Sequence, residues 1–149
     1  MNGAFCAVAG IRTGVALACV GLGLLAAGCG GGGALGPQSL VKRADAVGSL
    51  AAEGALLAQD GAAGKTTAIF TREHGGFLSK AASGTAAALK AAKTKPGLEP
   101  ELRKLRRLSA EVRDQLERLR GASQSEQRTL AGSLGKAAAA AATISKSIA

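Results

Sequence analysis

Cys29 is the residue whose setting most clearly predicts chemistry. The chain holds three cysteines, Cys6, Cys19 and Cys29, and the thiolate is a strong nucleophile. Cys29 directly follows Ala26-Ala27-Gly28, small residues at the end of an apolar run over 13–27. That run has about the length of the apolar core of a signal peptide and is short for a membrane span. The pattern predicts an exported precursor.

The segment Leu25-Ala26-Ala27-Gly28-Cys29 resembles the lipobox of bacterial lipoproteins. The resemblance implies that residues 1–28 are the signal peptide and that the Cys29 thiol takes a diacylglyceryl group. The protein would then be held by lipid at the extracytoplasmic face of the cell membrane. The commonest box has Leu three residues before the Cys, where this chain has Ala26. An ordinary secretory signal and an uncleaved membrane helix are the alternatives.

Three other short patterns imitate nucleotide-binding or catalytic motifs. Gly64-Lys65-Thr66 matches the end of a phosphate-binding loop, but Gln59 stands where the first Gly is required and a helix is expected before it. Ser133 and Lys136 have the spacing of an acylating Ser-x-x-Lys pair, and Ser39 and Lys42 have it too. Neither pair comes with the companion motifs of those enzymes. We therefore expect no enzyme, and we interpret Thr66 as a helix cap.

His74 is the only histidine, and removal of residues 1–28 would leave Cys29 as the only cysteine. One histidine without a thiolate partner cannot form an ordinary zinc site, so we expect no metal and no cofactor. His74 shares a helical stripe with Phe70 and Phe77. We interpret it as a partly buried packing residue, with a pH-sensitive contact as the alternative.

Positive charge is the main feature of the composition. The formal net charge is +9, and residues 29–149 carry 18 basic and 10 acidic side chains. Arg103, Lys104, Arg106 and Arg107 form a short basic cluster. Interleaved acidic residues favour a solvated helix face, and contact with anionic lipid or wall polymer is the alternative. Export would remove the protein from nucleic acid, so no nucleic-acid partner is expected.

Apolar spacing predicts an all-α fold. We expect a Gly-rich tether over residues 29–37 and a helical domain over 38–149. The predicted helices cover residues 38–59, 66–94, 98–120 and 123–149. Short connections between them favour an up-down-up-down four-helix bundle.

Each predicted helix has one apolar stripe. The members are Leu40, Ala44, Val47, Leu50 or Ala51, and Leu57; then Phe70, His74, Phe77, Ala81, Gly84, Ala88 and Ala91; then Leu98, Leu102, Leu105, Leu108, Val112, Leu116 and Leu119; and finally Leu130, Leu134, Ala137, Ala141, Ile144 and Ile148. Four pairs at a spacing of four predict ion pairs on the third helix: Glu99–Arg103, Arg107–Glu111, Arg113–Glu117 and Asp114–Arg118. Gly75-Gly76 predicts a kink in the second helix.

The segments Leu40–Val47 and Phe70–His74 also resemble small Ala-rich helical lipoproteins of unknown function from high-GC Gram-positive bacteria. That resemblance implies no activity. Two hypotheses follow from the sequence. One is a lipid-anchored, non-catalytic envelope protein with a structural or interaction role. The other is an envelope binding module that holds an apolar ligand between its helices, near Phe70 and Phe77.

Overall fold

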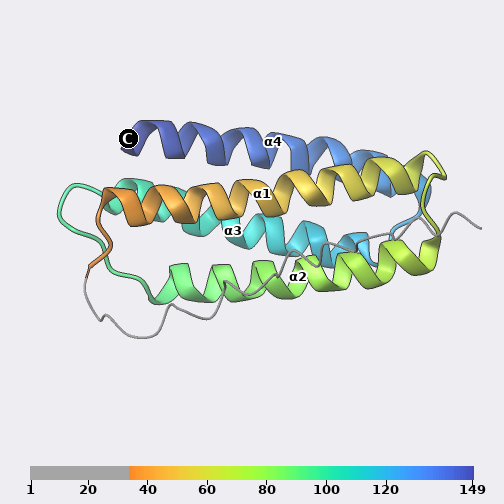
Figure 1. Cartoon of the computed structure of the whole chain (residues 1–149), viewed down its shortest axis with the longest axis horizontal. Coiled ribbons are helices and arrows are strands. Elements are labelled where there is room, and N and C mark those ends of the chain that lie inside the picture. Colours follow the sequence, from red (N-terminus) through yellow and green to blue (C-terminus); the bar gives the residue numbers. More distant parts are fainter. Residues whose placement is uncertain (1–33) are drawn as a thin grey trace, which may run out of the picture. The chain divides into compact units, whose positions relative to one another are not determined.

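Four long helices account for nearly all of residues 34–149, the part of the chain that the computed structural model describes (Figure 1). They are α1 (Pro37–Ala62), α2 (Ala68–Ala91), α3 (Glu99–Leu119) and α4 (Gln124–Ile148). Each begins and ends within three residues of its predicted bounds. Within residues 34–149, no helix is long and apolar enough to span a membrane. The predictions for Cys29, the signal peptide and residues 29–33 of the tether lie outside the described residues.

The four helices form an up-down-up-down bundle, as predicted. Short connections join successive helices, α1 packs most extensively along α4, and α2 packs along α3 (Figure 1). Contacts between α1 and α2 and between α3 and α4 close the bundle, and α1 also meets α3 across its centre. The all-α class and the bundle architecture are therefore confirmed.

Polar side chains outside the core cap the N-terminal ends of α2 and α4. Ser123 and Glu126 form a capping box at the start of α4: the Ser123 backbone N–H donates to Glu126 Oε2 at 2.8 Å, and the Ser123 side chain accepts from the Glu126 backbone N–H. The predicted cap of α2 was one residue too early. Thr67 accepts from the Phe70 backbone N–H, whereas the hydroxyl of Thr66 bonds to that of Thr71.

Residues 34–36 do not belong to a free tether. The Leu35 N–H donates to the Lys93 carbonyl at 2.7 Å, and the Lys95 N–H donates to the Leu35 carbonyl at 3.1 Å. These bonds make a parallel bridge between Leu35 and Thr94, in the connection between α2 and α3. The predicted tether is therefore shorter at its C-terminal end, because Leu35 is fixed to the bundle and α1 begins at Pro37.

Small residues bring α1 close to α4. A Cβ on Gly48 would lie 3.3 Å from the Ala141 Cβ, and one on Gly54 would overlap Leu116 Cδ2 and lie 3.2 Å from Leu134 Cδ1. Leucines fill the remaining space, and the largest fully buried side chains are Leu40, Leu78, Leu89, Leu105, Leu116, Leu119 and Leu134. The stripes predicted for α1, α3 and α4 are confirmed in these contacts, with Leu50, Leu98 and Ile148 half-buried at the margins.

The stripe predicted for α2 was wrong. Phe70 and Phe77 are 51% and 62% exposed. The buried positions are instead Thr71, Gly75, Leu78, Ser79, Ala82 and Leu89. The helix is rotated by about one residue, or 100°. This rotation buries the two leucines, and it sets the small residues Gly75 and Ser79 against α3 and the turn that follows it.

Gly75 and Gly76 make room for close packing. α2 runs through both residues without a break. A Cβ on Gly75 would lie 3.5 Å from Arg120 Cγ, and one on Gly76 would lie 3.3 Å from Arg120 Nε. The pair therefore leaves room for the Arg120 side chain, which lies across α2 just after α3 ends.

The ion pairs on α3 differ from the four predicted ones. Arg113 Nη2 lies 2.7 Å from Asp114 Oδ1, and Arg120 Nη1 lies 2.7 Å from Glu117 Oε1. Lys104 pairs with Glu101 at 3.7 Å. Long exposed side chains gain little from any one partner, so spacing alone does not select among neighbours.

Replacing Gly54 by Ala should destabilise the bundle. The new methyl group would collide with a fully buried leucine, and overpacking costs about 1–3 kcal/mol. That loss outweighs the gain in helix propensity of about 0.5–1 kcal/mol. Gly132→Ala, also inside a helix but with open space around it, should be stabilising. Urea denaturation of both variants measures the difference, and equal stabilisation would contradict the packing described for α1.

The capping box predicts a dependence of stability on pH. Hydrogen bonds from the backbone N–H and hydroxyl of Ser123 hold the pKa of Glu126 below its ordinary value of 4.5. A pKa lowered by folding adds stability that is present above pH 4.5 and lost as the pH falls through the folded-state value. Glu126→Gln should therefore lose less stability than the wild type between pH 6 and pH 3. Glu73→Gln, an exposed change on α2, should follow the wild type in the same urea titrations.

Candidate functional site

The predicted basic cluster lies on the first half of α3. Arg103, Lys104 and Arg107 are exposed, whereas Arg106 is half-buried. Lys104 pairs weakly with Glu101, and neither Arg103 nor Arg107 forms an ion pair within residues 34–149. Three of the four predicted residues can therefore meet a partner.

Arg106 has a different role. Its Nε donates to the Leu89 carbonyl at 2.8 Å, and its Nη2 donates to the Ala92 carbonyl at 2.6 Å. Both carbonyls belong to the C-terminal end of α2, where helical carbonyls lack partners within the helix. The guanidinium thus joins α3 to the end of α2, and Arg106 is not free to contact an anionic surface.

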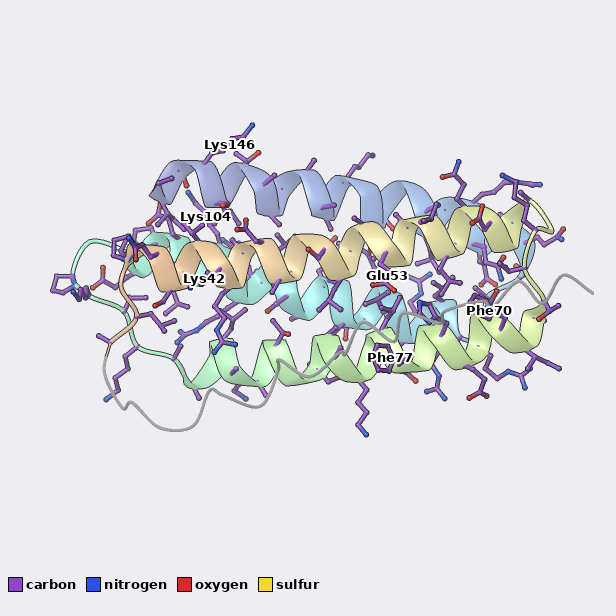
Figure 2. The ribbon with its side chains drawn as sticks, viewed as in Figure 1. Lys42, Glu53, Phe70, Phe77, Lys104 and Lys146 are labelled. Atoms are coloured by element: carbon purple, nitrogen blue, oxygen red, sulfur yellow. The ribbon has the colours of Figure 1, made fainter. Side chains whose placement is uncertain are left out.

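Charge is distributed unequally along the bundle. We call residues 34–48, 84–109 and 137–149 the basic half, which contains ten Lys and Arg but only three Asp and Glu. We call residues 49–83 and 110–136 the distal half: its eight Lys and Arg are nearly balanced by seven Asp and Glu. In Figure 2, Lys42, Lys104 and Lys146 from three helices lie toward one end of the bundle, and Phe70 lies toward the other. The sequence order hides this asymmetry, because the basic half is assembled from three separate segments.

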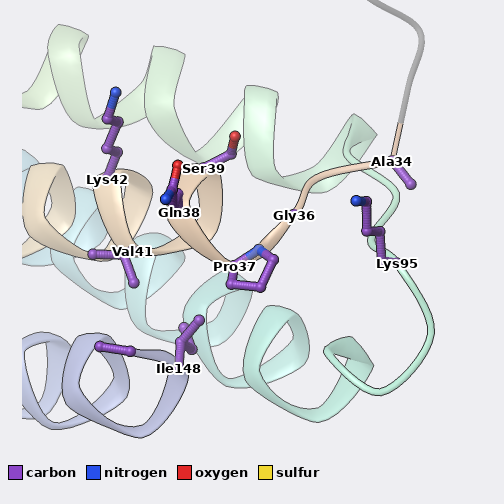
Figure 3. Close-up of a pocket in the computed structure, with 10 residues that line it drawn as sticks. Ala34, Gly36, Pro37, Gln38, Ser39, Val41, Lys42, Lys95 and Ile148 are labelled. Atoms are coloured by element: carbon purple, nitrogen blue, oxygen red, sulfur yellow. The ribbon is translucent and has the colours of Figure 1, made fainter.

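A surface groove lies where the chain joins the bundle in the basic half (Figure 3). It has a volume of about 920 Å³, and its walls come from the start of α1, the end of α4 and the α2–α3 connection. Lys42 and Lys95 line it on the polar side, and Pro37, Val41 and Ile148 supply apolar surface. The groove therefore combines positive charge with apolar contact area.

Two further grooves run between helices in or next to the basic half. One lies between α3 and α4 and has a volume of about 550 Å³, with Lys104 and Arg107 beside Leu108 and Ile144. The other lies between α2 and α3, has a volume of about 420 Å³ and contains Lys90, Arg106, Arg107 and Arg113. Basic side chains thus line hollows on several sides of this part of the bundle.

His74 lies outside the basic half, in a stack of rings on α2. Its ring centroid is 5.4 Å from that of Phe70 and 6.2 Å from that of Phe77, with interplanar angles of 10° and 19°. Its Nε2 lies 2.9 Å from Glu53 Oε1 on α1. The expected partial burial of His74 is confirmed, since its side chain is 32% exposed. Phe70 and Phe77 are on the surface, so they do not line a space between the helices.

Ser79 and Glu117 connect α2 to α3 in the distal half. The Ser79 hydroxyl donates to Glu117 Oε2 at 2.7 Å, and this bond, with a second from Arg120, holds the pKa of Glu117 below its ordinary value. The charges here are used within the fold, in contrast to the free basic side chains of the other half.

The residues that imitate catalytic and phosphate-binding motifs make ordinary helix and turn contacts. The Ser133 hydroxyl donates to the Leu130 carbonyl of its own helix at 3.1 Å. Gly64 has a positive φ of 70° in the short turn between α1 and α2. This backbone conformation favours glycine, so the glycine is accounted for by the turn and needs no bound phosphate. Within residues 34–149, no group of three or more His, Cys, Asp or Glu side chains is placed to hold a metal ion.

Comparison with models of protein families, with curated proteins and with solved structures finds no match to this chain.

Arg106→Ala should lower the free energy of unfolding by about 1–3 kcal/mol, because it removes two charge-assisted hydrogen bonds at the end of α2. Arg106→Lys should restore little of it, since one ammonium cannot reproduce the paired donors of the guanidinium. Arg103→Ala removes the same charge from an exposed position and should change stability by no more than about 0.5 kcal/mol. Equal effects of Arg106→Ala and Arg103→Ala in urea denaturation would exclude the structural role of Arg106.

Proposed function

We propose that this protein is a lipid-anchored, non-catalytic helical domain of the cell envelope, whose basic half lies against the anionic membrane that holds it. The observation that carries the proposal is the coincidence of two features at one end of the bundle. The chain joins the bundle there at Leu35, and the excess of positive charge gathers around the same point. The resemblance of Leu25–Cys29 to a lipobox supports the anchor.

The distance between the anchor and the bundle supports the contact. Leu35 lies six residues after Cys29, and a fully extended chain over those six steps spans about 20 Å. Electrostatic attraction is screened over about 8 Å at physiological ionic strength. A lipid on Cys29 would therefore keep the basic half within a few screening lengths of the head groups, and the Leu35 bridge removes slack that a longer tether would allow.

The charges are suited to a weak, adjustable contact. Each Lys or Arg near an anionic membrane contributes about 1 kcal/mol. Only part of the basic half can face one plane at a time, and its three acidic residues subtract from the attraction. The anchor supplies a high local concentration, so such weak attraction suffices to orient the domain. An interaction or structural role follows from this orientation, because the distal half would point away from the membrane.

The alternative, an apolar ligand held between the helices, has less support. It relied on space beside Phe70 and Phe77 in the core, and these residues are on the surface. Fully buried leucines from α1 to α4 fill the centre of the bundle.

Protection of lysines on vesicles tests the orientation. The full-length chain is reconstituted into vesicles of neutral or anionic lipid, and accessibility of lysines to a soluble reagent is read by mass spectrometry. Lys42, Lys95 and Lys146 should be protected on anionic vesicles compared with neutral ones, and 1 M salt should remove the protection by shortening the screening length to about 3 Å. Lys65, Lys80 and Lys136, exposed lysines of the distal half, provide the control positions.

The triple change of Lys42, Lys95 and Lys146 to Glu should abolish the protection of the remaining basic-half lysines. The triple change of Arg72, Lys80 and Arg128 to Glu removes the same charge and should leave it intact. Equal effects of the two triple variants would mean that net charge, and not its placement, governs the contact.

The anchor is tested separately. Cys29→Ala in the producing cell should release the protein into the aqueous phase of a detergent partition or leave it as an uncut precursor, because the thiol is the acceptor of the lipid. Retention and cleavage like those of the wild type would refute the anchor without bearing on the charge asymmetry.

A further inference from the structure

The groove between α2 and α3 is lined by more cationic side chains than the contacts within the bundle use. Four of its eight lining residues are Lys90, Arg106, Arg107 and Arg113, and none is acidic. The other four are small: Ser83, Ala86, Ala87 and Ala110. We propose that this groove holds a stretch of a linear polymer that carries phosphate groups at short intervals.

Two of the cations are free to bind. Lys90 and Arg107 are exposed and make no ion pair within residues 34–149. Arg113 is held by the neighbouring Asp114 through Nε at 2.9 Å and Nη2 at 2.7 Å, which reduces its effective charge. The strongest attraction for an anion therefore lies between Lys90 on α2 and Arg107 on α3, on the two sides of the groove.

Arg106 makes the groove suitable for an anion. The C-terminal end of a helix carries partial negative charge, which would repel phosphate from the end of α2. The Arg106 guanidinium donates to the carbonyls of Leu89 and Ala92 there, and it neutralises that end. The structural bond described above thus also removes an electrostatic obstacle to binding.

The dimensions favour a chain over a single small anion. Arg107 and Arg113 both line the groove and lie six residues apart on α3, a rise of about 9 Å along the helix. The alanines between the cations leave a channel without bulky side chains. A polymer that repeats its charge can meet several cations along this channel, whereas one phosphate meets only the nearest.

The lining also bears on the kind of polymer. Nucleic-acid strands are held in such grooves by stacking of bases on aromatic rings, and no aromatic residue lines this groove. A backbone of repeating phosphate without bases fits the lining better. The site lies on the side of the bundle, and its argument depends on neither the lipid anchor nor the membrane contact.

The test measures binding of inorganic polyphosphate to the full-length chain in neutral detergent at low ionic strength. Lys90→Gln should weaken binding about tenfold, as expected for one charge-assisted contact. Lys146→Gln removes the same charge from α4, outside the groove, and should change the affinity for polyphosphate by less than about twofold. Ala87→Trp fills the groove without changing the charge and should weaken binding at least as much as Lys90→Gln.

Ala46→Trp, a change at another exposed alanine, on α1, is the control for Ala87→Trp, and circular dichroism checks that all variants are folded. Should Ala87→Trp unfold, the comparison of Lys90→Gln with Lys146→Gln still decides. Loss of affinity in the controls equal to that in the groove variants would overturn the proposal. The proposal would also be overturned if inorganic phosphate, at the same total concentration of phosphate, displaced all of the bound polyphosphate. It would be overturned as well if an oligothymidylate of equal charge bound as tightly as polyphosphate and lost affinity in the Ala87→Trp variant.

Discussion

The close approach of α1 to α4 is the constraint on which the rest of the bundle depends. It depends on Gly48, where a Cβ would lie 3.3 Å from the Ala141 Cβ, and on Gly54, where a Cβ would lie 3.2 Å from Leu134 Cδ1 of α4 and overlap Leu116 Cδ2 of α3. Bringing two helices together in this way lets a chain rich in Ala form a core, since small side chains bury area only where backbones are close. Leu116 and Leu134 then fill the centre, and α2 and α3 pack against a pair whose spacing is already set.

The arrangement of charge follows from the topology of the bundle. An up-down-up-down chain returns to the same end after every second helix, so Lys42, Lys104 and Lys146 lie toward the same end although they are far apart in the sequence (Figure 2). The nearly neutral distal half uses its charges differently. There, Glu117 accepts from Ser79 and Arg120, and Glu53 contacts His74. The two halves thus differ: polar side chains join helices in the distal half, whereas in the basic half Arg106 does so and Lys90, Arg103 and Arg107 make no ion pair within residues 34–149.

The sequence predicted the bundle and three of its four buried stripes, because the leucines of α3 and the Leu and Ala positions of α1 and α4 repeat at helical spacing. The buried face predicted for α2 was wrong, because Phe70 and Phe77 outweighed the smaller residues in the apolar pattern. The burial of that face is set by glycines that accept Arg120 and by Ser79 bonding to Glu117. These are contacts between helices, and no periodicity within one helix encodes them.

The basic cluster was predictable as a list of residues but not as a surface. Spacing on α3 does not show that Arg106 reaches the carbonyls of Leu89 and Ala92, nor that Lys42, Lys95 and Lys146 come near the same end. The choice of ion-pair partners was equally beyond the sequence, since Arg113 has an acidic neighbour at position 114 as well as at 117.

The Leu35 bridge has a mechanical consequence. Any pull on the chain ahead of residue 34 acts first on the two hydrogen bonds that join Leu35 to Lys93 and Lys95. These bonds distribute the load to the α2–α3 connection as well as to the start of α1. When the pull runs along the axis of α1, further extension must slide α1 along α4, where the contact is most extensive, so that many contacts resist together. A pull across that axis would instead separate α1 from α4 beginning at the N-terminal end of α1, and the Leu35 bridge is the first contact to resist it.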